Sequence, residues 1–143
     1  MMDEPTHTTI GDAVQRVSDE WVGVKGPVRP GTAAVTTAGR MPAGMIVHVV
    51  GPRHRPDQDN AALLAQAVRA ALDAADDAGA ASVALPAISA GIFGYPPPEA
   101  TAVIARTCAA WLAEGGRGVT DVALVGFDAD TAQLFTEAVR RGT

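Results

Sequence analysis

Between Ser82 and Pro98 a short apolar strand, a loop bracketed by two glycines and the start of a helix follow one another directly. Glycine has no side chain, so backbone N–H groups near Gly91 and Gly94 can approach a ligand closely. The first turn of the next helix adds unpaired N–H groups and the positive end of the helix dipole. This succession is typical of an α/β fold and predicts a site for a phosphate-like ligand at the loop.

Periodic apolar segments extend the same alternation along the chain. Strands are predicted at residues 32–36, 45–50, 82–85 and 120–127, and helices at 12–21, 60–79, 97–114 and 130–142. Alternation of strand and helix in the second half indicates parallel pairing with crossover helices. The apolar run at 45–50 predicts a strand buried on both faces. Asp130 is expected to cap the last helix.

The length and composition fit one domain. A chain of 143 residues with 48% hydrophobic content can bury one core, so 1–143 is expected to be a single domain with a flexible segment at 1–10. The single cysteine, Cys108, excludes an internal disulfide and is expected to be a buried small hydrophobe. The sequence has no apolar run near the roughly 18 residues of a membrane span and no secretory signal pattern. We therefore expect a cytoplasmic protein without a membrane partner.

The charge pattern limits the partners. A net charge of −5, with Lys25 the only lysine, argues against broad nucleic-acid binding. A phosphate site made of backbone N–H groups needs no lysine. The histidines and the cysteine lack metal-ligand spacing, so neither a metal nor another cofactor is expected. The stretch 53–57 is predicted to be an exposed loop.

Four segments carry a resemblance to a known family. Residues 86–96 read Pro-Ala-Ile-Ser-Ala-Gly-Ile-Phe-Gly-Tyr-Pro and resemble the second ligand loop of the macrodomain family, of the Appr-1″-p processing type. Residues 32–39, 47–52 and 122–128 are similar to three of its strands. The resemblance covers the chain from Gly11 to the C-terminus.

This resemblance implies a three-layer α-β-α fold with a mixed sheet, abbreviated at its N-terminus and lacking the usual first two strands. In the family the second strand lies inside the sheet, so its loss leaves two half-sheets unless they pair directly or another segment fills the gap. An exposed interior edge favours aggregation. A second chain could cover it, so a homodimer is plausible.

The resemblance also implies a ligand, ADP-ribose. The loop would hold the diphosphate and distal ribose with N–H groups of Gly91, Ile92 and Phe93 as donors, and the Phe93 ring would cover the ribose. Phe127 either stacks on adenine, as in many members, or is a core aromatic at a strand end. Ser89 either contacts the ligand or only closes a turn. The expected ligand residues are Ser89, Ala90, Gly91, Ile92, Phe93, Gly94 and Phe127.

Other candidate residues have two interpretations. His48 lies in an apolar strand and is interpreted as a satisfied core histidine rather than a catalytic one. Trp21 and Trp111 fall on apolar helix faces and are expected in the core rather than as platforms for a ligand. Tyr95 is expected to pack under the loop, as the family aromatic at this position does.

Hydrolytic members of the family use an Asn-Ala-Ala-Asn loop that this sequence lacks, and the catalytic residues stay unknown. Asp12 is the one weak candidate, since it could orient a water or simply cap a helix. Three functions are open. The first is binding of ADP-ribose, free or linked to a macromolecule. The second is hydrolysis of ADP-ribosyl groups or processing of ADP-ribose derivatives, and the third is the role of a degenerate structural domain. The missing loop favours binding over hydrolysis.

Overall fold

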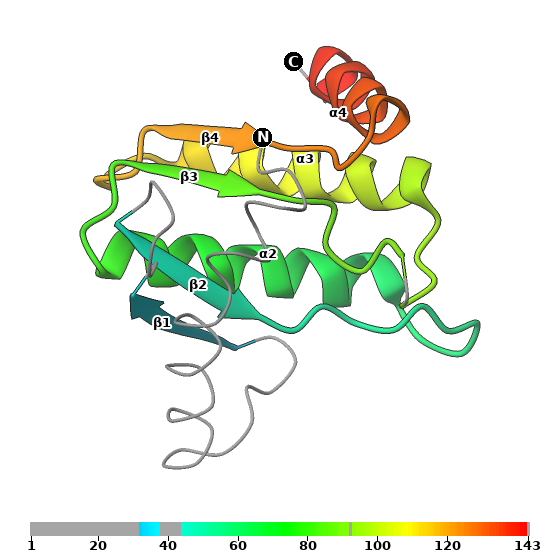
Figure 1. Cartoon of the computed structure of the whole chain (residues 1–143), viewed down its shortest axis with the longest axis horizontal. Helices are drawn as coiled ribbons and strands as arrows, with labels where there is room; N and C mark the ends of the chain where they lie inside the picture. Colours follow the sequence, from blue (N-terminus) through cyan, green and yellow to red (C-terminus); the bar gives the residue numbers. More distant parts are fainter. Residues whose placement is uncertain (1–31, 38–43, 92, 143) are drawn as a thin grey trace.

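The computed structural model describes residues 32–37, 44–91 and 93–142 of the chain. Within these ranges the order is β1 (Ala33–Thr37), β2 (Met45–Val49), α2 (Asn60–Asp77), β3 (Ser82–Leu85), α3 (Pro97–Glu114), β4 (Asp121–Leu124) and α4 (Ala129–Gly142). Figure 1 shows β2, β3 and β4 running in the same direction and β1 running against them. The predicted helix at 12–21 and the segment 1–10 lie outside the described residues.

The described strands form two separate sheets of two strands each. β1 and β2 pair antiparallel, with Val35 opposite Val47, and β3 and β4 pair parallel, with Val83 opposite Val122. The parallel pair joined by α3 confirms the predicted crossover unit. Two half-sheets are also what the resemblance led us to expect for a sheet without its interior strand.

The prediction that β2 is buried on both faces was wrong. Every residue from Met45 to Val49 is only half-buried. Within the described chain β2 pairs along one edge, with β1, and this explains the residual exposure of its residues. The last strand is also shorter than predicted, because regular pairing covers Asp121–Leu124 rather than 120–127. One further backbone bond extends the pairing at each end, from the Thr120 N–H to the Ala81 carbonyl and from the Val125 N–H to the Leu85 carbonyl.

The helix ends follow ordinary capping rules. Asp59 caps α2 by accepting a hydrogen bond from the Ala62 N–H at 3.0 Å, and Gly79 ends it with φ of +88°. Prolines occupy the first positions of α3, where no N–H partner is lost. The predicted cap of α4 was wrong, since Asp128, not Asp130, accepts from the Thr131 N–H at 2.8 Å.

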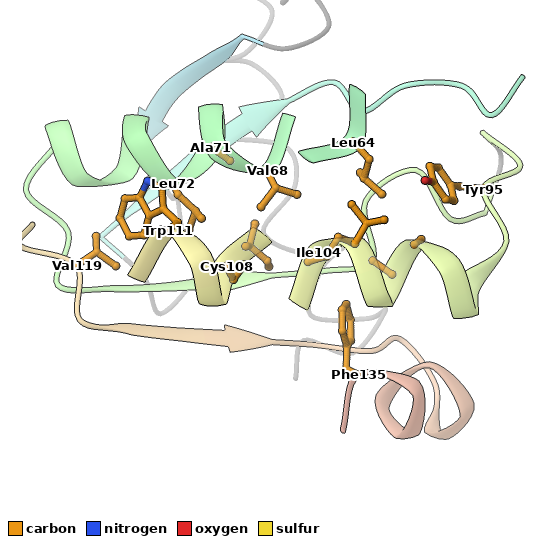
Figure 2. Close-up of a cluster of buried hydrophobic side chains, with 14 residues drawn as sticks. Leu64, Val68, Ala71, Leu72, Tyr95, Ile104, Cys108, Trp111, Val119 and Phe135 are labelled. Atoms are coloured by element: carbon orange, nitrogen blue, oxygen red, sulfur yellow. The ribbon is translucent and has the colours of Figure 1, made fainter. Parts of the chain in front are cut away.

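The core lies mainly between α2 and α3, with Phe135 of α4 packed against α3 on the other side (Figure 2). Trp111 is fully buried, as expected, and its indole N–H donates to Asp73 at 2.8 Å. The Arg117 guanidinium lies 4.2 Å from the ring centroid. Cys108 is buried as predicted, and burial raises the pKa of its thiol to about 12. No described helix is long and apolar enough to cross a membrane.

Candidate functional site

The C-terminal ends of β2, β3 and β4 lie at the same end of the molecule, on the right in Figure 1. Three loops follow these strands, at 50–59, 86–96 and 125–128. In α/β folds ligands bind beyond the carboxyl ends of the strands. The loops therefore place the predicted ligand residues at the end of the fold where a pocket is expected.

The loop after β3 has an unusual backbone. Ser89, Gly91 and Gly94 have positive φ angles of 69°, 104° and 76°. Ser89 is the one non-glycine residue in the described chain with a positive φ. The Gly94 N–H donates to the Gly91 carbonyl at 3.0 Å, and the Tyr95 N–H donates to the Ser89 carbonyl at 3.1 Å. A non-glycine residue with a positive φ, such as Ser89, persists only where its surroundings hold it, and such residues concentrate at functional sites.

The Ser89 hydroxyl is buried and has no hydrogen-bond partner among the described residues. It lies directly over Gly51, the residue that follows β2 and Val50. A Cβ built at Gly51 would lie 2.3 Å from the Ser89 Oγ and 2.5 Å from the Ile88 Cγ2. Glycine at 51 thus lets the two loops approach closely. A buried hydroxyl without a partner costs about 1–3 kcal/mol, which is the kind of cost that a binding site imposes on a fold.

Tyr95 packs beneath the loop, as predicted. It is 4% exposed, and the His54 ring meets it edge-on with 4.9 Å between the ring centroids. Burial, and the nearby Glu99 carboxylate, raise the pKa of Tyr95. The backbone N–H of His54 donates to the Phe93 carbonyl at 2.9 Å, so the loop after β2 also supports the loop after β3.

The outer side of the glycine loop is open. Gly91 is exposed, and a Cβ built there meets nothing within 4 Å. The Phe93 ring is half-buried, and the Phe93 N–H has no acceptor among the described residues. Ala90 is half-buried and Gly94 exposed. Ile92, the remaining member of the expected set, lies outside the described residues.

Phe127 is 77% exposed, so it is not the core aromatic that the second interpretation required. It follows β4, and the next residue, Asp128, caps α4. The hydrogen bond from the Thr131 N–H lowers the pKa of the Asp128 carboxyl. The cap fixes the backbone beside Phe127 while the ring stays accessible for stacking.

His48 has the structural role that the sequence indicated. Its Nε2 lies 2.7 Å from the Thr36 Oγ1 on the neighbouring strand, and burial lowers its pKa. Among the described residues no group of His, Cys, Asp or Glu could hold a metal ion. The catalytic candidate Asp12 and the predicted core residue Trp21 lie outside the described residues.

Residues 53–57 were predicted only as an exposed loop, which is confirmed, and no prediction from the sequence connected them with the site. In the structure the Arg53 guanidinium lies 5.1 Å from the centroid of the Phe93 ring. Arg53 and Phe93 line a cleft of about 280 Å³ beside the glycine loop. The two arginines at 53 and 55, in a chain with a single lysine, were the signal that could have found it.

Comparison with known proteins identifies the family. The model of the Macro domain family matches residues 2–104. A Klebsiella pneumoniae O-acetyl-ADP-ribose deacetylase is 35% identical over 135 residues, covering 94% of this chain and 77% of that protein. The structure of a mutant Oceanobacillus iheyensis macrodomain with ADPR superposes with a TM-score of 0.84 at 27% identity, covering 94% of this chain and 74% of that one. The chain belongs to the Macro domain family, and its α/β macrodomain fold is the fold that the sequence predicted.

The relatives are longer than this chain. An uncharacterized Sulfolobus acidocaldarius protein is 48% identical over 86 residues, which are 60% of this chain. The match spans 46% of that protein, so this chain covers just under half the length of that relative.

Proposed function

We propose that this protein binds ADP-ribose, free or as an ADP-ribosyl group on a macromolecule. The diphosphate and distal ribose lie along residues 89–94, with N–H groups of Gly91, Ile92 and Phe93 as donors. Adenine stacks on the Phe127 ring, a contact worth about 1–3 kcal/mol in nucleic-acid binding. The family membership and the ADPR bound by the Oceanobacillus iheyensis macrodomain support this ligand class.

One observation carries the proposal, the conformation of Ser89. Its backbone is left-handed and its hydroxyl is buried without a partner among the described residues. A residue that only closed a turn would bond its hydroxyl to a nearby backbone group. The Ser89 hydroxyl instead remains available to donate to an anionic oxygen. Ser89 is therefore assigned to the ligand rather than to the turn.

Isothermal titration calorimetry with ADP-ribose tests the proposal. Gly91→Glu places a negative side chain at the diphosphate and should abolish detectable binding. Gly79→Glu is the matched control, because Gly79 also has a positive φ and open space around it. Gly79 follows the C-terminal end of α2, whereas the loop at 50–59 leads into the N-terminal end of that helix. If Gly91→Glu bound ADP-ribose as tightly as Gly79→Glu and the wild type do, the ligand would not lie along the loop. No heat with the folded wild-type protein would leave the degenerate structural domain as the remaining function.

Hydrolysis of ADP-ribose derivatives is the second candidate. It is favoured by the Klebsiella relative, which is named O-acetyl-ADP-ribose deacetylase and matches 94% of this chain. Incubation with an ADP-ribosylated protein or with O-acetyl-ADP-ribose, followed by measurement of released product, tests the activity. Undiminished turnover by Asp12→Ala would remove Asp12 as a catalytic residue.

A homodimer and a cytoplasmic location stay predictions. β2 and β3 each pair along one edge only within the described residues, so a second copy could add a strand there. Light scattering during size-exclusion chromatography would give the mass in solution. A monomer at all concentrations would contradict the dimer.

A further inference from the structure

The cleft beside Phe93 adjoins the glycine loop, but Ser89, Gly91 and Gly94 do not line it. It has a volume of about 280 Å³ and is lined by apolar and basic groups, among them Pro52, Arg53, Arg55, Leu63 and Phe93. Phe93 is the residue that the cleft shares with the ADP-ribose site. A group attached to the distal ribose, which Phe93 is proposed to cover, would leave the site next to this cleft.

The backbone that presents the two arginines is held by side chains near the start of α2. Asn60 accepts from the Arg55 N–H at 3.0 Å and donates to the Arg55 carbonyl at 2.7 Å. Gln58 donates to the Arg53 carbonyl at 2.5 Å and to the Asn60 side chain at 2.8 Å. The loop is therefore ordered without using either guanidinium. Preorganised groups lose less conformational freedom on binding.

Neither guanidinium is neutralised within the described chain. Arg69 and Arg117 form ion pairs with carboxylates, whereas Arg53 and Arg55 form none with any described residue. Arg53 instead lies over the Phe93 ring, 5.1 Å from its centroid. A guanidinium stacked on an aromatic ring keeps its N–H groups free at the edge, where they suit a carboxylate or a phosphate.

We propose that this cleft binds an acidic peptide segment of the protein that carries the ADP-ribosyl group, with Arg53 and Arg55 contacting carboxylates close to the modified residue. The inference rests on the proposed ADP-ribose site and names the class of macromolecule attached to the ligand. The apolar surface of Leu63 and Pro52 suits the aliphatic stems of a peptide.

A peptide fits the charges better than a nucleic acid does. Asp57 and Asp59 are exposed within the same loop as the arginines, and the whole chain has a net charge of −5. A continuous row of phosphates would lie against these carboxylates. One or two peptide carboxylates can contact the arginines alone.

The test compares two short peptides, each with ADP-ribose joined to the central residue through a non-hydrolysable linkage. In one the flanking residues are glutamates, and in the other they are glutamines. The wild-type protein should bind the glutamate peptide about three- to tenfold more tightly, which is the range expected for exposed charged contacts. Added salt should reduce the preference because it screens exposed charges.

Arg55→Gln should remove this preference and leave the affinity for free ADP-ribose within about twofold, since the Asn60 bonds to the backbone at 55 remain. Arg141→Gln is the control, because Arg141 is exposed at the end of α4 and the charge change is the same. It should change neither affinity.

The outcomes separate the two proposals. Equal binding of both peptides by a protein that binds free ADP-ribose would overturn the peptide inference and keep the ligand. If the folded wild-type protein bound neither peptide and no free ADP-ribose, both proposals would be overturned. An ADP-ribosylated oligonucleotide that binds more tightly than the glutamate peptide, through Arg55, would assign the cleft to nucleic acid and reject the peptide.

Discussion

Substitution of Gly51 by alanine should disturb the candidate site through one methyl group. The added Cβ would lie 2.3 Å from the Ser89 Oγ and 2.5 Å from the Ile88 Cγ2. Carbon atoms pack best at about 3.5–4.0 Å, so the second contact is too short by about 1 Å or more. The serine hydroxyl can rotate away, but Ile88 is β-branched and stiff at χ1. The loop backbone must therefore move.

Overpacking of this kind costs about 1–3 kcal/mol. For a domain of this length the Tm should fall by about 3–10 °C. Displacement of Ser89 should also remove the proposed charge-assisted hydrogen bond to the ligand, and the affinity for ADP-ribose should then fall by about tenfold or more. Differential scanning fluorimetry and calorimetry on the same preparation measure both effects.

Gly44→Ala is the matched control. Gly44 directly precedes the other end of β2, and a Cβ there meets nothing within 4 Å. This variant should keep both the Tm and the affinity of the wild type. If Gly51→Ala behaved like Gly44→Ala, the close approach of the two loops would not determine the position of Ser89, and the reasoning would be refuted.

Three further substitutions or conditions give separate tests. Gly126→Ala should destabilise the fold by more than Gly51→Ala, because its Cβ would lie 2.3 Å from the backbone N of Ala132 in α4; a Tm shift below that of Gly51→Ala would contradict this. Phe127→Ala should weaken ADP-ribose binding by about 5- to 150-fold if adenine stacks on the ring, while the Tm stays unchanged because the ring is exposed. Burial lowers the pKa of His48, so the unfolded chain takes up a proton at higher pH than the folded chain. The stability due to neutral His48 is fully present above the ordinary histidine pKa of 6.5 and is lost as the pH falls through the lowered value. Thermal melts of His48→Gln should therefore show a smaller fall in Tm than the wild type across that pH window.

Local elements could be predicted from the sequence where a single pattern determined them. The limits of β3 and α3 agree with the structure, because glycine, proline and apolar periodicity mark both ends. The sequence alone does not distinguish the N-cap of α4, because Asp128 and Asp130 are both residue types that cap helices well. The position at which β4 ends decides in favour of Asp128. The half-burial of β2 depends on which strands pair, and pairing is a property of the whole fold.

The candidate site could be predicted in outline. The glycine loop was found from its motif, and the structure adds the conformation of Ser89. A serine with positive φ is uncommon, so no propensity predicts it. The cleft near Arg53 was missed because it forms between two loops far apart in the sequence, and the arginines at 53 and 55 indicate only one of those loops.

If the proposed ligand accepts from the unpartnered hydroxyl of Ser89, ligand binding and stability are coupled at this residue. The fold tolerates about 1–3 kcal/mol at this position, together with a backbone conformation that costs about 1–2 kcal/mol for a residue with a Cβ. Any anion that accepts from the hydroxyl recovers part of that free energy. The loop is thus a place where the protein is less stable than its fold allows, and where a stabilising replacement at position 89 and retention of ligand affinity are expected to oppose each other.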